Sequence, residues 1–186
     1  MSRPMKKEAK RLTAMSNTCL LISVEEGRWN QALPDFGSLS DQVMATVFDY
    51  ISSLGEIDFW DGKKPMEVNL CLSNDANVQK LNKEFRGMDK PTNVLSFANI
   101  DDEAFAEDCE LYEEIELGDI IIALETLERE ADLKQIPLSD HYCHLLTHGL
   151  LHLLGFDHIE DEEAEYMESC EVKILEKLNI KNPYLD

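Results

Sequence analysis

One helical segment near the C-terminus constrains the fold of this chain more than any other stretch. The protein has 186 residues and five histidines, and all five lie between residues 141 and 158. On a helical wheel of 100° per residue, four of them fall within an arc of about 80°, while leucines occupy the opposite side. These four are His141, His144, His148 and His152. The pattern predicts a helix over 139–154 with one packing face and one imidazole face.

The spacing within this segment predicts a metal site. His148 and His152 lie one helical turn apart, so that their side chains can share one ion. Gly155 can adopt the left-handed conformation that ends a helix, and the returning chain can then bring in His158. Three histidine ligands leave a fourth position for water, which is the pattern of a catalytic zinc site. We therefore predict one Zn²⁺ per chain, held by His148, His152 and His158.

The other polar residues of the segment are open to two interpretations each. We expect His141 and His144 to lie on the helix surface or to support the ligands from outside the coordination sphere. Asp157 could orient the last ligand, or it could cap the following helix.

The spacing HxxxHxxGxxH is that of the metzincin peptidases. In those enzymes a glutamate follows the first histidine and acts as the general base. Gly149 occupies that position here. The sequence thus predicts a metzincin-like metal-binding helix, but the missing base weakens a peptidase function.

Alternating segments of strand and helix type predict an α+β fold, with a small mixed β-sheet of about four strands packed with helices. Strands are expected over 18–24, 66–73, 92–100 and 118–124. Helices are expected over 41–55 (capped by Ser40 and ended by Gly55), 74–85, 124–134, 139–154 and 161–179. The acidic segment 101–114 is expected to be a solvated loop.

Length and composition indicate a single domain over 16–186, after a basic and flexible arm over 1–15. The predicted zinc site makes this a candidate metal-dependent hydrolase domain. No apolar run is long enough to span a membrane. The five cysteines are widely spaced, which fits reduced thiols in the cytoplasm. The net charge of −21 argues against non-specific binding of nucleic acid. A local basic cluster nevertheless stands out, formed by Lys80, Lys83, Arg86 and Lys90.

The motifs resemble those of a known family. "HGLLHLLGFDH" (148–158) is similar to the HGxLHLxGYDH signature of the YbeY family, the bacterial metal-dependent endoribonucleases of ribosome maturation, with Phe156 where tyrosine is usual. "LNKEFRGMDKPTNVLSF" (81–97), "LGDIIIA" and "NPY" (182–184) also agree with the family. The resemblance covers about residues 60–184, and the first 55 residues carry no motif.

This resemblance implies a function. The family's activity is single-strand-specific cleavage of RNA, including maturation of the 3′ end of small-subunit (16S) rRNA, and ribosome quality control. By position, His148, His152 and His158 resemble the zinc ligands, and Arg86 resembles the family's functional arginine. The guanidinium fork of Arg86 suits a phosphate, although a surface ion pair is the alternative.

The implied partners are single-stranded RNA or rRNA and the small ribosomal subunit with its proteins, in the cytoplasm and without a membrane. Two other functions stay open: a metallopeptidase, and a ribosome-assembly factor whose metal is mainly structural.

Overall fold

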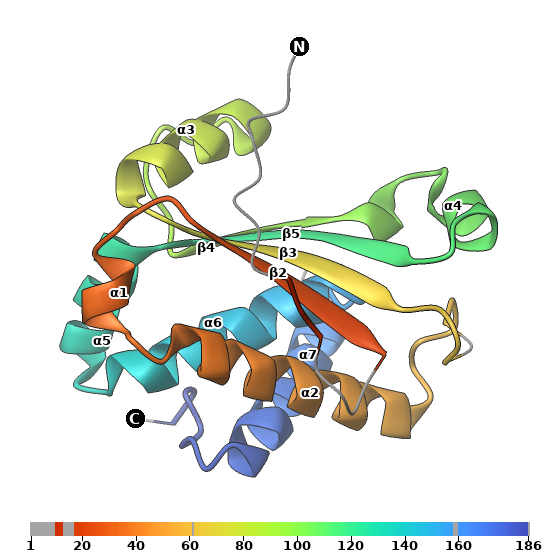
Figure 1. Ribbon diagram of the computed structural model, residues 1–186. Coiled ribbons are helices and arrows are strands. Elements are labelled where there is room, and N and C mark those ends of the chain that lie inside the picture. The colour runs from red at the N-terminus through yellow and green to blue at the C-terminus, as the bar shows by residue number, and fades with distance from the viewer. Residues whose placement is uncertain (1–9, 13–16, 61, 158–159, 186) are drawn as a thin grey trace.

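A mixed β-sheet forms the centre of the molecule, as the computed structural model in Figure 1 shows. The structure describes residues 10–12, 17–60, 62–157 and 160–185. Within these ranges the sheet has five strands in the order β1-β2-β3-β5-β4. They are β1 (Lys10–Leu12), β2 (Thr18–Val24), β3 (Met66–Ser73), β4 (Val94–Ala98) and β5 (Ile115–Ala123).

The three inner strands run parallel, and the two edge strands, β1 and β4, run antiparallel to their neighbours. The sequence of β3, MEVNLCLS, is mostly apolar because helices cover both faces of this central strand. In β5, Gly118 has φ +133° beside a register shift in the pairing with β3. A Cβ atom there would lie 2.0 Å from the carbonyl oxygen of Phe97, so only glycine lets β4 pair at this point.

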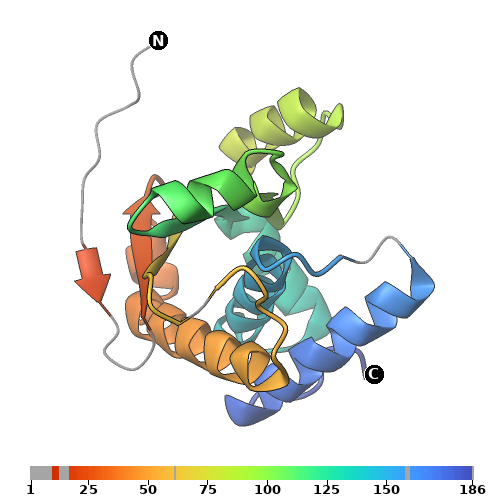
Figure 2. The same ribbon diagram turned by 90° about the vertical axis from the view of Figure 1, so that its right-hand side faces the viewer.

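Helices cover the two faces of the sheet unequally (Figure 1). Three helices, α2, α6 and α7, lie on one face, and Figure 2 shows α2 (orange) and α7 (blue) meeting below the sheet. On the opposite face lies α3. At one end of the sheet lie α1 and α5, with α5 packed against α6, and α4 lies at the other end. The bounds are α1 (Trp29–Ala32), α2 (Phe36–Leu54), α3 (Asp75–Arg86), a short 3₁₀ turn η1 (Asn99–Asp101), α4 (Phe105–Leu111), α5 (Leu124–Lys134), α6 (Leu138–Leu153) and α7 (Asp161–Lys177).

Two apolar clusters follow from this arrangement. The larger cluster fills the space between the sheet and the layer of α2, α6 and α7. The smaller one lies under α3 and joins Val78 to Leu95 and Ile121 of β4 and β5. β4 therefore contacts helices on both of its faces while its outer edge lies at the border of the sheet.

The α+β class and the mixed sheet are confirmed, with the short strand β1 added to the four expected strands. The three C-terminal helices agree with their expected bounds to within two residues. The strand expected over 118–124 begins earlier, at Ile115. Of the expected arm 1–15, only residues 10–12 lie within the described ranges, and they form β1. No helix in the described ranges has both the length and the apolar character needed to cross a membrane.

Two local predictions were wrong. Ser40 does not cap α2, because the helix begins four residues earlier and the Ser40 hydroxyl donates to the carbonyl oxygen of Phe36 at 2.6 Å. The helix does end at Gly55, in the left-handed conformation, as predicted. The acidic segment 101–114 is not simply a loop, since it contains α4. Phe105 is buried and packs edge-on against Phe59, which holds this acidic helix to the body of the protein.

Candidate metal centre

The helix α6 carries the candidate site and is buried along most of its length. Its packing face meets the sheet, where Gly149 lies so close that a Cβ atom would come within 3.0 Å of Ile120 and 3.2 Å of the Ser96 hydroxyl. A side chain at this position would press on the side chains of Ile120 and Ser96, which would have to shift. The position that holds the general base in metzincins is therefore a close contact between helix and sheet in this protein.

His148 and His152 point their Nε2 atoms at one another. These two nitrogens are 3.1 Å apart, and the two rings lie nearly perpendicular, with their centroids 4.5 Å apart. A tetrahedral zinc ion bonded at about 2.0–2.1 Å would separate two ligand nitrogens by roughly 3.3 Å. The observed separation fits a shared ion.

The opposite nitrogen of each ring faces an acceptor. His148 Nδ1 lies 2.7 Å from the Glu171 carboxylate, and His152 Nδ1 lies 3.0 Å from the carbonyl oxygen of Phe156. Both acceptors require a proton on Nδ1, so both Nε2 atoms carry lone pairs. Two lone pairs at this distance repel unless a cation lies between them, and the chemistry of this donor pair therefore fits a metal ion.

The end of α6 adopts the expected turn. Gly155 has φ +91°, its N–H donates to the carbonyl oxygen of His152 at 3.0 Å, and the N–H of Phe156 donates to that of Leu151 at 3.1 Å. This pair of bonds is a Schellman motif, which reverses the chain after the helix. The reversal also places the Phe156 carbonyl against His152.

The third predicted ligand, His158, lies outside the described residues, so its role stays a prediction. Among the residues that the structure does describe, no group of three or more His, Cys, Asp or Glu side chains forms a metal cluster. The N-cap position of α7 is Glu160, so Asp157 does not cap that helix. The other interpretation, that Asp157 orients His158, stays a prediction.

His141 and His144 are not on the helix surface, because they are only 1% and 9% exposed. Each donates from Nε2 to a carboxylate: His141 to Glu130 at 2.8 Å, and His144 to Glu171 at 2.9 Å. His144 therefore shares its acceptor with His148, which agrees with a supporting role outside the coordination sphere.

Glu171 contacts two of these histidines and was not singled out from the sequence. It is 1% exposed and lies on the apolar face of α7, among Met167, Ile174 and Leu175. Burial raises the pKa of Glu171, but hydrogen bonds from His144 and His148 outweigh that effect and lower the pKa to about 2. The signal in the sequence was a charged residue at a helical position otherwise taken by apolar side chains.

Arg86 is not in contact with the histidines. It is the last residue of α3, the helix that lies on the opposite face of the sheet from α6 (Figure 1). The Arg86 side chain is exposed. Within the described part of the chain Arg86 makes no ion pair or hydrogen bond, whereas nearby Lys83 pairs with Asp89 at 2.6 Å. The neighbouring Phe85 packs on Phe97 of β4, so the edge strand lies between the end of α3 and the metal-binding helix.

Comparison with known sequences decides the family. A sequence model described as Endoribonuclease YbeY matches residues 37–179. A relative from Sphingopyxis alaskensis, named Endoribonuclease YbeY, is 48% identical over 89% of this chain and 99% of its own length. Another of that name, from Paramagnetospirillum magneticum, is 43% identical over 84% of this chain and 89% of its own. The chain belongs to the YbeY family.

The match to the YbeY family extends further than the motifs suggested, since it begins within α2 rather than near residue 60. A solved structure, the solution structure of TM1509 from Thermotoga maritima, covers 90% of this chain and 99% of its own, with a TM-score of 0.53 and 22% identity. That likeness supports the fold.

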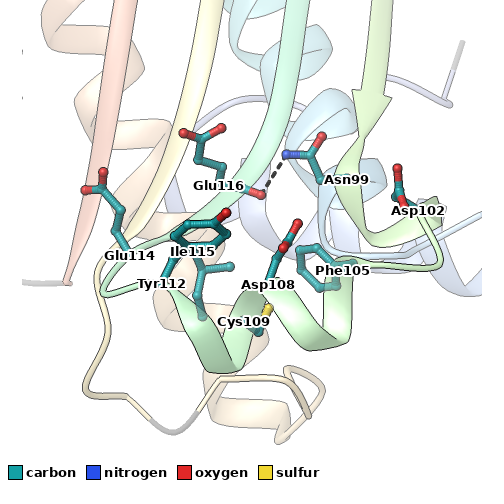
Figure 3. Close-up of a pocket in the computed structure, with 9 residues that line it drawn as sticks. All are labelled: Asn99, Asp102, Phe105, Asp108, Cys109, Tyr112, Glu114, Ile115 and Glu116. Atoms are coloured by element: carbon teal, nitrogen blue, oxygen red, sulfur yellow. Dashed lines mark hydrogen bonds between the residues drawn. The ribbon is translucent and has the colours of Figure 1, made fainter.

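A separate cavity lies at the far end of the sheet, where α4 joins β5 (Figure 3). It has a volume of about 500 Å³ and contains none of the histidines. Its lining includes the carboxylates of Asp102, Asp108, Glu114 and Glu116. Such a lining repels phosphate, so this cavity is unsuited to the RNA backbone that a YbeY protein would bind.

Proposed function

We propose that this YbeY protein is a zinc-dependent, single-strand-specific endoribonuclease. We further propose that it matures the 3′ end of small-subunit (16S) rRNA and acts in ribosome quality control, in the cytoplasm and together with the small ribosomal subunit and its proteins. The observation that carries the proposal is the convergence of His148 and His152 through Nε2 atoms whose opposite nitrogens already face acceptors.

The residues of the chain divide the work. His148 and His152, with His158 as the expected third ligand, would hold the ion. A bound zinc ion would supply Lewis acidity towards a phosphoryl oxygen and lower the pKa of a coordinated water. Arg86, across the edge strand β4 from the histidines, supplies a planar cation that has no ion pair among the described residues and can bind a phosphate through two parallel hydrogen bonds.

The charge of the molecule limits where RNA can bind. With a net charge of −21, most of the surface repels phosphates, and the basic cluster around α3 is a local exception. RNA contact restricted to one surface agrees with a substrate presented by a ribosomal subunit. The same restriction favours the second candidate, an assembly factor with a mainly structural metal.

A metallopeptidase function is less compatible with this geometry. The position of the peptidase base is occupied by Gly149, and a glutamate there would press on the side chains of Ile120 and Ser96. Substitution of this glycine would therefore be expected to disturb packing rather than to create a peptidase.

The deciding experiment is cleavage of a defined single-stranded RNA by zinc-loaded protein, with a duplex of the same sequence and an unstructured peptide as alternative substrates. We expect cleavage of the single strand only, and no cleavage by a His148→Ala variant purified in parallel, which controls for contaminating nuclease. Equal cleavage by the variant, or cleavage of the peptide alone, would contradict the proposal. Full zinc content in a His148→Ala, His152→Ala double variant would contradict the ligand assignment.

A further inference from the structure

One buried carboxylate serves two histidines of the same helix. Glu171 reaches from α7 to α6, where its Oε1 atom accepts from His148 Nδ1 at 2.7 Å and its Oε2 atom accepts from His144 Nε2 at 2.9 Å. The hydroxyl of Tyr184, from the C-terminal segment, also donates to Oε2. Each carboxylate oxygen of Glu171 therefore accepts hydrogen bonds, and the two oxygens have different donors.

These contacts specify opposite tautomers for the two histidines. An ionised carboxylate can only accept hydrogen bonds, so each imidazole must present N–H to it. His148 then carries its proton on Nδ1 and a lone pair on Nε2, whereas His144 carries its proton on Nε2. The Nδ1 atom of His144 is buried and has no hydrogen-bond partner among the described residues, which suits a nitrogen without a proton.

We propose that Glu171 is a positioning residue that locks His148 in the Nδ1–H tautomer, so that the Nε2 lone pair faces His152 and a shared metal ion. This inference rests on the metal site of the proposed function and assigns a role to a residue outside that site. His144 and Tyr184 hold the second oxygen of Glu171, which fixes the direction of the first. The C-terminal segment and α7 thereby set the chemistry of a ligand on α6.

The two candidate ligands are held in different ways. His152 is oriented by the carbonyl oxygen of Phe156, a backbone group that every residue would provide. His148 instead depends on a side chain distant in sequence. A substitution of Glu171 should therefore impair His148 and leave the contact between His152 and Phe156 in place.

The chain contains a matched control. Glu130 of α5 accepts a hydrogen bond at 2.8 Å from His141, which lies on α6 like His148. Like Glu171, Glu130 also has a second donor, the side-chain amide of Asn93 at 2.9 Å. His141 is not one of the converging histidines. A Glu130→Gln variant thus loses a charged hydrogen bond from α6 without touching His148 or His152, although the Glu130 side chain is 32% exposed and that of Glu171 only 1%.

The first test uses the wild-type chain free of metal. The ¹⁵N shifts of its imidazoles report which nitrogen carries the proton, and we expect Nδ1–H for His148 and Nε2–H for His144. An Nε2–H tautomer at His148 would overturn the proposal. Because this measurement needs no variant, it tests the inference even if substitution of a buried glutamate prevents folding.

The second test compares zinc affinity in competition with a chromophoric chelator. Loss of a group that orients a metal ligand typically weakens binding by about 10–100-fold, and we expect Glu171→Gln to fall in that range and Glu130→Gln to stay close to wild type. We also expect the ¹⁵N spectrum of Glu171→Gln to show His148 as a mixture of tautomers. Wild-type zinc affinity in folded Glu171→Gln would overturn the proposal. Failure of the wild-type protein to bind zinc would instead overturn the proposed function, and the tautomers would still be read in the metal-free chain.

Discussion

At the scale of single residues, the candidate site depends on which nitrogen of an imidazole is available. A histidine is a metal ligand only through an unprotonated nitrogen, and the partner of the other nitrogen decides which one that is. His148 and His152 satisfy this condition through two unlike acceptors, a carboxylate and a carbonyl. His144 has the opposite tautomer although it lies on the same face of α6, which shows that position on a helix alone does not make a ligand.

Arg86 provides the residue-level prediction that separates a nuclease from a peptidase. We expect Arg86→Ala to keep its fold and zinc content but to cleave single-stranded RNA roughly 100-fold more slowly under single-turnover conditions, since a donor to the charged transition state is lost. Arg86→Lys should recover part of the rate, because lysine keeps the charge but not the two-pronged geometry. The control is Lys83→Ala on the same helix, where we expect a smaller effect. A wild-type rate for Arg86→Ala would refute the phosphate-binding role.

Gly155 provides a second prediction. Valine is strained at φ +91°, and its Cβ would also approach Ile100 to 3.1 Å. We expect Gly155→Val to weaken zinc binding with little loss of helical circular dichroism, because the turn that returns the chain towards the site is disturbed. Gly55→Val imposes a comparable strain at the end of α2, at φ +75°, and should leave zinc affinity unchanged. Equal zinc affinity in the two variants would show that the Gly155 turn does not support the site.

At the scale of elements, the close approach of α6 to β4 and β5 is what places the histidines. Gly149 permits this approach, and Tyr142 anchors the start of the helix by a hydrogen bond to Ser40 of α2 at 2.6 Å. Gly149 and Tyr142 are seven residues apart, so both contacts lie on the same side of α6. The packing face of the helix therefore determines where its imidazole face points.

Gly149→Leu is the test of this packing. The added side chain has no space against Ile120, so we expect the free energy of unfolding to fall by about 1–3 kcal/mol, the usual cost of overpacking a core. Gly37→Ala in α2 is the control, because a Cβ atom there meets nothing within 4 Å. That variant should be unchanged or more stable by about 0.4–1 kcal/mol. Denaturant unfolding measures both, and a Gly149→Leu variant as stable as wild type would exclude a tight contact here.

At the scale of the whole molecule, charge and thiol chemistry limit what the protein can do. The net charge of −21 leaves few places for RNA, so we expect RNA affinity to fall with increasing salt, but with a shallow slope because few cations are available. Titrations of RNA binding over a range of salt concentrations measure this slope. A steep dependence would indicate a wider basic surface than the cluster around α3.

The cysteines are expected to take no part in metal binding. Burial raises the pKa of Cys71 to about 11 and that of Cys143 to about 12, so both stay protonated at neutral pH and are poor ligands. A variant with all five cysteines replaced by alanine should lose some stability, since three of them are buried, but should bind zinc at the wild-type stoichiometry. Elemental analysis after dialysis checks this, and loss of zinc from a folded variant would contradict it.

The sequence by itself determined the features that depend on local geometry. A helix rotates 100° per residue, so the shared face of His148 and His152 follows from their spacing, and the left-handed turn at Gly155 follows from the freedom of glycine. Only the tertiary structure decided the rest. Glu171 is 23 residues from His148 in the chain, and the contact exists because α7 packs against α6. The sequence showed that Gly149 replaces the general base of the metzincins. That this glycine also permits close packing of α6 on the sheet could be seen only from the position of Ile120. Local periodicity cannot encode such contacts, because they depend on how separate elements pack.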